Sequence, residues 1–235
     1  MEELQEKFKA GQILLIDKPY TWSSFDVVRK IRNTIRIKKV GHAGTLDPLA
    51  TGLLIVCTGK FTKRIEEIQG QVKEYTGIIE LGKTTPSYDL ETDFDSTTSI
   101  EHVSKENVLA SRDAFIGEIE QFPPVFSAIK KDGVRAYEHA RKGREVKLES
   151  RSVVIHGFEL VKIDLPEVHF KITCSKGTYI RSIAHDFGQQ LGVGGYLKSL
   201  RRTRIGDYLV SDAKDVLAFC DEIKPNPVHG DNTGS

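Results

Sequence analysis

The chain has 235 residues, of which 39% are hydrophobic and 29% charged, and its formal net charge is +1. These values are typical of a globular protein with one large domain or two small ones. No apolar run approaches the length of a membrane span, and the charged start MEELQEKFKAGQ lacks the apolar core of a signal peptide. We therefore expect a cytoplasmic protein without a membrane partner, and a monomer by default.

The three cysteines, Cys57, Cys174 and Cys220, are far apart and form no CxxC or Cys/His cluster. This spacing favours buried free thiols over a zinc site or a disulfide framework.

Positive charge gathers in three stretches although the net charge is small. Residues 29–39 carry six basic side chains and no acid, residues 198–204 carry four without an acid, and residues 130–151 have eight basic against four acidic ones. Each stretch is either a solvated face or a surface that holds the phosphates of a nucleic acid.

The first expected elements are a strand and a helix. Residues 13–16 form a short apolar run that ends at Asp17-Lys18-Pro19, which predicts a buried strand. Ser23 or Ser24 then begins a helix to about Ile37. Its apolar face is predicted to carry Phe25, Val28, Ile31 and Ile35, with basic side chains on the other face. Residues 1–10 precede these elements as an N-terminal extension.

A glycine-rich loop, residues 41–52, follows and leads into a second buried strand at 53–57. Residues 73–81 have the composition of a strand in the same sheet, and the polar, acidic residues 83–101 indicate a loop.

The second half alternates strands and helices irregularly. We expect a helix from Ser104 to near Gly117, extended backbone at 121–128, a projecting basic segment and a strand at 153–161. Residues 167–174 alternate as a half-buried strand does, and Thr178 can cap a helix to about Leu191. Residues 225–235 indicate a disordered tail. The order favours one mixed α/β or α+β domain over residues 11–224.

The glycine-rich loop does not read as a nucleotide site, because it has neither the Walker spacing nor GxGxxG after a strand. It presents Asp47 between Leu46 and Pro48, and an Asp-Pro pair by itself is typical of a turn. The chain has no GxSxG or HExxH motif, which argues against a serine hydrolase or a zinc peptidase.

Several segments carry a specific resemblance. The stretch GHAGTLDPLATGLLIVCTGKFTK resembles the signature of the TruB family of tRNA pseudouridine-55 synthases, and five more segments match in the same order: LLIDKPYTWSS, KEYTGIIELGKTT, FPPVFSAIKKDGVRAYEHARKG, CSKGTYIRSIAHDFG and LRRTRIG. The resemblance covers roughly residues 11–215. It implies the pseudouridine-synthase fold, with a mixed, mainly antiparallel central sheet flanked by helices and a thumb at about 124–150.

The resemblance also implies roles for single residues. Asp47 matches the catalytic nucleophile, and Arg181 matches the arginine that keeps this carboxylate ionised through a two-pronged contact. Tyr75 matches the tyrosine that stacks on the target base and carries a proton. His42 matches the histidine that fills the space left by a flipped base.

Further positions follow from the same motifs. Tyr179 and Leu200 match pocket residues, and Lys18 and Pro19 match a motif that supports the active-site loop. The implied partner is the T-arm of tRNA, whose phosphates would be held by the following basic residues: Lys130, Arg135, Arg141, Arg201 and Arg202. No cofactor or metal is implied, since the reaction is an isomerisation of uridine to pseudouridine.

The chain departs from the family pattern at two places. Ala43 stands where the family often has threonine, and few residues follow Val210, so the additional C-terminal RNA-binding domain of many relatives is expected to be missing. Two alternatives stay open: a guide-RNA-dependent pseudouridine synthase acting on ribosomal RNA, and a tRNA-folding chaperone. The sequence does not decide whether Asp47 attacks C6 of uracil or C1′ of ribose.

Overall fold

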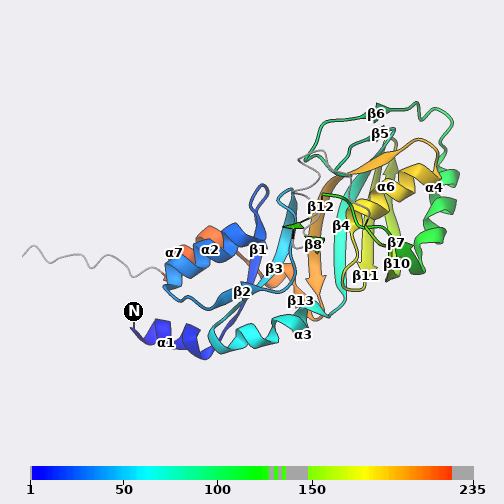
Figure 1. Cartoon of the computed structure of the whole chain (residues 1–235). Helices are drawn as coiled ribbons and strands as arrows, with labels where there is room; N and C mark the ends of the chain where they lie inside the picture. Colours follow the sequence, from blue (N-terminus) through cyan, green and yellow to red (C-terminus); the bar gives the residue numbers. More distant parts are fainter. Residues whose placement is uncertain (1, 127–129, 132–133, 136–147, 224–235) are drawn as a thin grey trace, which may run out of the picture.

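A single ten-stranded sheet organises the protein (Figure 1). The computed structural model describes residues 2–126, 130–131, 134–135 and 148–223, and for residues 130–131 and 134–135 it describes the backbone alone. The strands of the sheet are β1 (Ile13–Lys18), β2 (Val40–His42), β3 (Ala50–Thr58), β4 (Lys73–Leu81), β7 (Gly117–Gln121), β10 (Arg151–Asp164), β11 (Glu167–Cys174), β12 (Gly195–Ile205), β13 (Tyr208–Leu209) and β14 (Lys214–Asp215).

The strands lie in the order β14-β1-β3-β12-β4-β11-β10-β7, with β2 beside β3 and β13 beside β12. Only the β1–β14 and β3–β12 pairs are parallel, so the sheet is mixed and mainly antiparallel, as predicted. Two short hairpins lie outside it: β5 (Lys83–Thr84) with β6 (Ser96–Thr97), and β8 (Lys130–Lys131) with β9 (Val134–Arg135).

Helices cover the sheet at both ends (Figure 1). They are α1 (Glu2–Ala10), α2 (Ser24–Ile35), α3 (Ile65–Gln69), α4 (Lys105–Arg112), α6 (Ile180–Gln190) and α7 (Val216–Ile223), with 3₁₀ turns η1 (Gly59–Arg64), η2 (Asp113–Phe115) and η3 (Val210–Asp212). Helices α2 and α7 bury their apolar faces with Leu54 and Val56 of β3, and Phe8 of α1 joins the same cluster. Helix α6 packs with β4, β10 and β11 in the largest cluster. No helix within the described residues is long and apolar enough to span a membrane.

The sequence pattern of each strand follows from the faces that it buries. Strand β3 has helices on one face and α3 on the other, because Leu54 and Val56 join one cluster while Leu53 and Ile55 join another. A strand buried on both faces needs a continuous apolar run. Strand β11 buries only one face, and its apolar residues therefore alternate with polar ones.

Three local predictions need correction. Phe25 is 58% exposed, and Val27 takes its place on the buried face of α2, because a helix turns about 100° per residue and Val27 aligns with Ile31. Thr178 does not cap α6: its hydroxyl bonds the carbonyl of Ser175, and Tyr179 is the N-cap residue. Strands β7 and β12 both lie within residues for which no strand was predicted.

Several other predictions are confirmed. The capping box of α2 pairs Ser23 with Asp26, and all three cysteines are buried and free. The predicted tail at 225–235 and Arg141 lie outside the described residues.

Candidate active site

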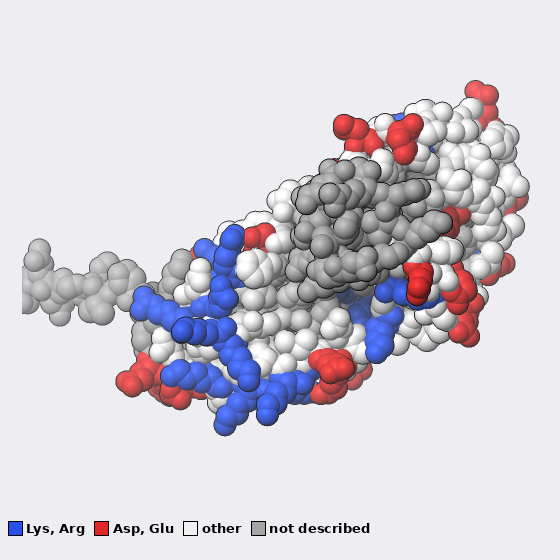
Figure 2. Space-filling model, in the orientation of Figure 1, with Lys and Arg blue, Asp and Glu red and all other residues white. Residues whose placement is uncertain are grey.

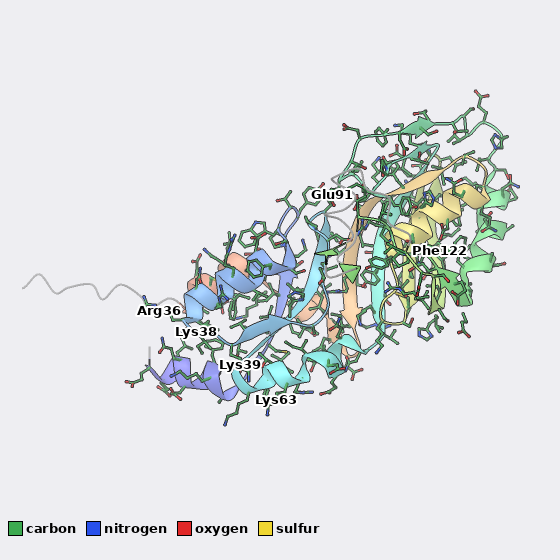
Figure 3. All side chains as sticks on the ribbon, viewed as in Figure 1. Arg36, Lys38, Lys39, Lys63, Glu91 and Phe122 are labelled. Carbon is green, nitrogen blue, oxygen red and sulfur yellow. The ribbon has the colours of Figure 1, made fainter. Side chains whose placement is uncertain are left out.

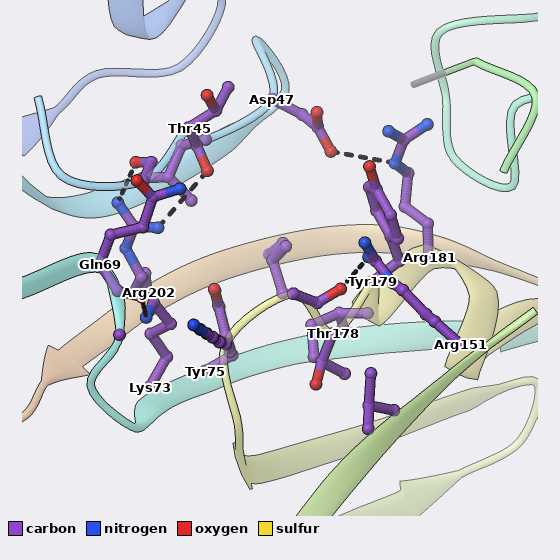
Figure 4. Close-up of a pocket in the computed structure, with 18 of the residues that line it drawn as sticks. Thr45, Asp47, Gln69, Lys73, Tyr75, Arg151, Thr178, Tyr179, Arg181 and Arg202 are labelled. Atoms are coloured by element: carbon purple, nitrogen blue, oxygen red, sulfur yellow. Dashed lines mark hydrogen bonds and ion pairs between the residues drawn. The ribbon is translucent and has the colours of Figure 1, made fainter. Parts of the chain in front are cut away.

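Residues from five separate segments line a cavity of about 630 Å³ beside the Asp47 loop (Figure 4). Six predicted site residues meet there: Asp47, Tyr75, Tyr179, Arg181 and Leu200, which were assigned to the catalytic pocket, and Arg202, which was assigned to RNA binding. Two others, Lys73 and Arg151, were not predicted. This volume is in the range of small-ligand sites, and the walls combine aromatic rings with charged groups.

The backbone of the Asp47 loop is held by hydrogen bonds from the start of α2. The buried hydroxyl of Ser24 donates to the carbonyl of Leu46 at 3.0 Å and accepts from its amide at 2.8 Å. Gly52 has a φ of +100°, and a Cβ there would lie 2.3 Å from the carbonyl oxygen of Arg202. The glycine is therefore required where β3, which follows the loop, pairs with β12.

Lys18 ties the end of β1 to the same loop. Its fully buried ammonium donates to the carbonyls of Pro19, Trp22 and Pro48 at 3.0, 2.5 and 3.2 Å. Burial lowers the pKa of Lys18 to about 8, with the charge of Asp47 opposing that shift. This placement fits the predicted role of Lys18 and Pro19 in supporting the loop.

Arg202 is also buried, and it holds the loop rather than facing solvent. Its guanidinium donates to the carbonyls of Leu53, Gly44 and Thr45 at 2.8, 3.1 and 3.4 Å, and the residue is 1% exposed. The prediction that Arg202 contacts RNA phosphates does not fit this burial, because phosphate contact requires an accessible guanidinium.

Arg181 is a third buried cation at the loop and lies against the carboxylate of Asp47. Its Nε lies 2.9 Å from Asp47 Oδ2 and 3.6 Å from Asp89 Oδ2, and its side chain is 4% exposed against 36% for Asp47 (Figure 4). The two terminal nitrogens donate to the carbonyls of Ser87 and Phe126 at 3.0 and 2.9 Å. The contact with Asp47 is thus one-pronged, which corrects the predicted two-pronged geometry, since the backbone takes the other nitrogens.

Asp89 is a residue that sequence reasoning missed. It lies in the acidic residues 83–101, whose composition predicts a loop, yet it is buried beside Arg181. Burial raises the pKa of Asp89, and the Arg181 charge offsets that shift only in part. Nothing in the local sequence distinguishes Asp89 from its exposed acidic neighbours, because its partner is almost a hundred residues away.

Tyr75 projects from β4 into the cavity, opposite Arg202 in the register of β12. The residue is 7% exposed, and burial raises the pKa of its hydroxyl. Tyr75 therefore stays protonated at neutral pH and can donate a proton in a hydrogen bond.

Tyr179 is held at the mouth of the cavity by two contacts. The side-chain amide of buried Gln121 accepts from the Tyr179 amide at 2.7 Å and donates to its carbonyl at 3.0 Å. The guanidinium of Arg151 lies over the Tyr179 ring, 4.5 Å from its centroid. Neither Gln121 nor Arg151 belongs to a motif that pointed to this role.

His42 lies on β2 next to the loop and outside the cavity lining. Burial and the charge of Arg202 lower its pKa, so the imidazole is neutral at neutral pH. Among the described residues, no three His, Cys, Asp or Glu side chains gather as metal ligands would.

Of the other predicted RNA contacts, Arg201 is half-exposed and pairs with Asp17 at 2.6 Å. Lys130 and Arg135 face each other across the β8–β9 hairpin in backbone register, and Arg141 lies outside the described residues.

Comparison with known proteins places this geometry in a family. Residues 32–180 match the model of the N-terminal domain of TruB family pseudouridylate synthases, and residues 181–221 match that of the tRNA pseudouridylate synthase B C-terminal domain. The chain belongs to the TruB family. The residues of the second match are not a separate unit here, because β12 pairs with both β3 and β4.

Curated relatives of similar length agree. The chain is 56% identical to the tRNA pseudouridine synthase B of Flavobacterium johnsoniae over 91% of this chain and 96% of that protein. It is 52% identical to the enzyme of the same name from Phocaeicola vulgatus, over 90% and 93%.

Solved structures share the fold. The chain aligns with a protein of a Cbf5-Nop10-Gar1 complex with a TM-score of 0.72 and 27% identity, over 93% of this chain and 56% of that one. A similar match, with a TM-score of 0.69 and 26% identity, is to an H/ACA RNP bound to a substrate RNA, over 94% and 55%. The chain thus spans little more than half the length of these structural neighbours.

Proposed function

We propose that this member of the family converts the uridine at position 55, in the T-loop of tRNA, to pseudouridine, with Asp47 as the nucleophile. The observation that carries the proposal is the 2.9 Å ion pair between Asp47 and buried Arg181 at the wall of the cavity. A guanidinium that is fixed by two backbone carbonyls gives the neighbouring carboxylate a cationic partner in a defined position.

The reaction is an isomerisation, and its atoms balance without a co-reactant. Asp47 attacks either C6 of the uracil or C1′ of the ribose, and the bond between N1 and C1′ breaks. The uracil then turns, C5 forms a bond to C1′, and the proton on C5 leaves while N1 gains one. Asp47 departs unchanged as a carboxylate.

A stacked uridine cannot reach Asp47, so the base must leave its stack. Base flipping costs on the order of a few kcal/mol, which contacts in the site must offset. Tyr75 and Tyr179 provide aromatic surfaces in the cavity. We assign the stacking role to Tyr75, and to His42 the filling of the gap in the RNA.

The proposed path for the rest of the RNA begins on a basic surface beside the end of α2 and η1. Figure 2 shows lysines and arginines gathered over the ends of α2 and η1, and Figure 3 labels Arg36, Lys38, Lys39 and Lys63 there. We call these four residues the outer basic patch. All four are exposed, and none makes an ion pair with another described residue.

One segment of the chain, η1 followed by α3, connects the outer basic patch to the cavity lining. The amide of Gly59 bonds the carbonyl of Lys39 at 2.8 Å, which joins the residues after α2 to η1. Helix α3 follows η1 directly, and its residues Glu66 and Gln69 line the cavity. RNA phosphates bound on the patch would thus lie along the route to Asp47.

The T-arm as binding target, a monomeric state and a cytoplasmic location belong to this proposal. The high identity to tRNA pseudouridine synthases supports tRNA as the substrate. The likeness to H/ACA proteins keeps a guide-RNA-dependent activity as the second candidate.

One assay separates these functions. An unmodified tRNA transcript and the same transcript with cytidine at position 55 are incubated with the protein, without and with total RNA as a source of guides, and pseudouridine is mapped. The proposal expects product at position 55 of the first transcript alone, without added RNA. Product that requires added RNA would favour the guide-dependent activity. If the protein refolds the tRNA but forms no pseudouridine under either condition, the result would favour the chaperone function.

A further inference from the structure

We propose that Tyr88 and His185 form a stacked pair that positions Asp89 and Ser87 around Arg181, and through Arg181 directs the carboxylate of Asp47. The inference rests on the proposed function, because it assigns positioning residues to that reaction. Neither residue touches the cavity.

The two rings are in close contact. Their centroids are 3.9 Å apart and their planes differ by 16°, which is a stacked arrangement. His185 follows Arg181 by four residues on α6, so both side chains lie on one face of that helix. Tyr88 immediately precedes Asp89. One ring contact therefore joins the helix that carries Arg181 to the loop that carries Asp89.

Tyr88 stands between the two residues that hold Arg181. The carbonyl of Ser87 accepts from the Arg181 guanidinium at 3.0 Å, and the carboxylate of Asp89 lies 3.6 Å from its Nε. A shift of this loop would move both contacts together. Since Nε is also the atom that faces Asp47, the position of the loop sets the direction of the catalytic ion pair.

The loop is in a conformation that its surroundings must maintain. Tyr88 has a φ of +64°, in the left-handed region that bulky residues avoid. The amide of Leu197 on β12 donates to the Tyr88 carbonyl at 2.9 Å, and Thr85 donates to the Asp89 carbonyl at 2.7 Å. The Leu197 bond ties the loop to β12, the Thr85 bond closes the loop on itself, and the ring stack joins it to α6.

The imidazole of His185 contributes to the stack through its ring face rather than through a polar contact of Nδ1. Its Nδ1 is buried and has no hydrogen-bond partner among the described residues. Burial lowers the pKa of His185, which keeps the ring neutral at neutral pH although Asp95 opposes the shift. A neutral, flat ring at this position acts as a stacking surface.

The test compares aromatic and aliphatic variants in the full chain. The single-turnover rate at saturating unmodified tRNA transcript and the tRNA Kd are measured for Tyr88→Ala, Tyr88→Phe, His185→Ala and His185→Phe. We expect the alanine variants to slow product formation on the order of 10- to 100-fold, as a displaced catalytic group does, while Kd stays within about twofold. The phenylalanine variants keep the stack and should stay within about threefold of wild type. Phe94→Ala is the matched control. Phe94 belongs to the same segment as Tyr88, residues 83–101, but its ring packs on Tyr196 and does not contact Arg181.

Two further measurements distinguish positioning from loss of fold. In an Asp89→Asn background, Tyr88→Ala should add little further loss, because both changes act on the same contact. Hydrogen exchange at the Leu197 amide should rise in Tyr88→Ala and return to the wild-type rate in Tyr88→Phe. Fully multiplicative rate losses, or slow phenylalanine variants, would overturn the inference.

Failure of the proposed function gives a different pattern. If the wild-type protein makes no pseudouridine, that function fails, and the exchange measurement still decides the inference. Unchanged protection of the Leu197 amide in Tyr88→Ala would show that the stack does not hold the loop.

Discussion

Two basic stretches look alike in the sequence and differ in the folded protein. On β12, Lys198 pairs with Glu80 and Glu167 at 2.6 Å, Arg201 pairs with Asp17, and buried Arg202 bonds three backbone carbonyls. The other stretch, residues 29–39, contributes Arg36, Lys38 and Lys39 to the outer basic patch, whose residues make no ion pair with another described residue. The first set is therefore part of the sheet and its loops, while the second is available to an external polyanion.

The comparison shows what a charge run in the sequence leaves open. The partners of β12 come from strands that are distant in the chain, since Asp17 is on β1 and Glu80 on β4. Residues 198–204 contain no acidic side chain that would indicate these partners in the sequence. Exposed charges need no partner because water solvates them, whereas a buried guanidinium requires several hydrogen bonds.

The largest expected effect is the loss of stability when the buried cation of β12, Arg202, is removed. Arg202→Met leaves the carbonyls of Leu53, Gly44 and Thr45 without their donor. We expect the free energy of unfolding to fall by about 3 kcal/mol, measured by urea denaturation. The matched change Arg201→Met removes a half-exposed ion pair and should cost less than about 1 kcal/mol. Equal losses in the two variants would contradict the distinction.

A second prediction uses the pH dependence of Lys18. Its pKa is about 8 in the folded protein and 10.5 in the unfolded chain, so the unfolded chain holds more protons between these values. The stability of wild type relative to Lys18→Met should therefore rise between pH 8 and 10.5, by at most about 3 kcal/mol. Below pH 8 the difference should be flat. A difference that stays flat between pH 8 and 10.5 would mean that burial does not lower the pKa of Lys18, and a difference that falls would mean that the pKa is raised; either result would contradict the prediction.

Removing exposed lysines of the outer basic patch should have a smaller effect, which is confined to the affinity for tRNA. Lys38→Gln together with Lys63→Gln should raise the tRNA Kd about tenfold and lower the slope of log Kd against log salt by about one for each lost phosphate contact. The rate at saturating tRNA should not change. Lys162→Gln with Lys171→Gln is the matched control, because both lysines are exposed and paired with carboxylates. If the slope of log Kd against log salt is the same in wild type and in both double variants, the RNA does not bind on the outer basic patch.

Much of the fold could be predicted from local patterns. The continuous run of β3, the alternation of β11 and the capping box of α2 each reflect the immediate environment of the segment. Helical periodicity was less exact, since Phe25 and Val27 are both apolar and it is Val27 that packs into the cluster with β3 and α7.

The candidate site divides in the same way. Asp47, Tyr75, Tyr179, Arg181 and Leu200 were predicted from motifs, and the structure brings them to one cavity. Asp89, Gln121 and Arg151 were missed because their partners, Arg181 and Tyr179, are distant in sequence. Arg202 was taken for a surface cation because burial across strands leaves no mark on neighbouring residues.

The central claim is that Asp47, held by Arg181, is the nucleophile that converts the T-loop uridine. Its most direct test is to map pseudouridine in an unmodified tRNA transcript after incubation with wild type and with Asp47→Asn, while tRNA affinity is measured for both. The account predicts pseudouridine at position 55 with wild type, none with Asp47→Asn, and Kd values within about threefold, since the amide keeps the shape of the side chain. Formation of pseudouridine by Asp47→Asn would contradict it.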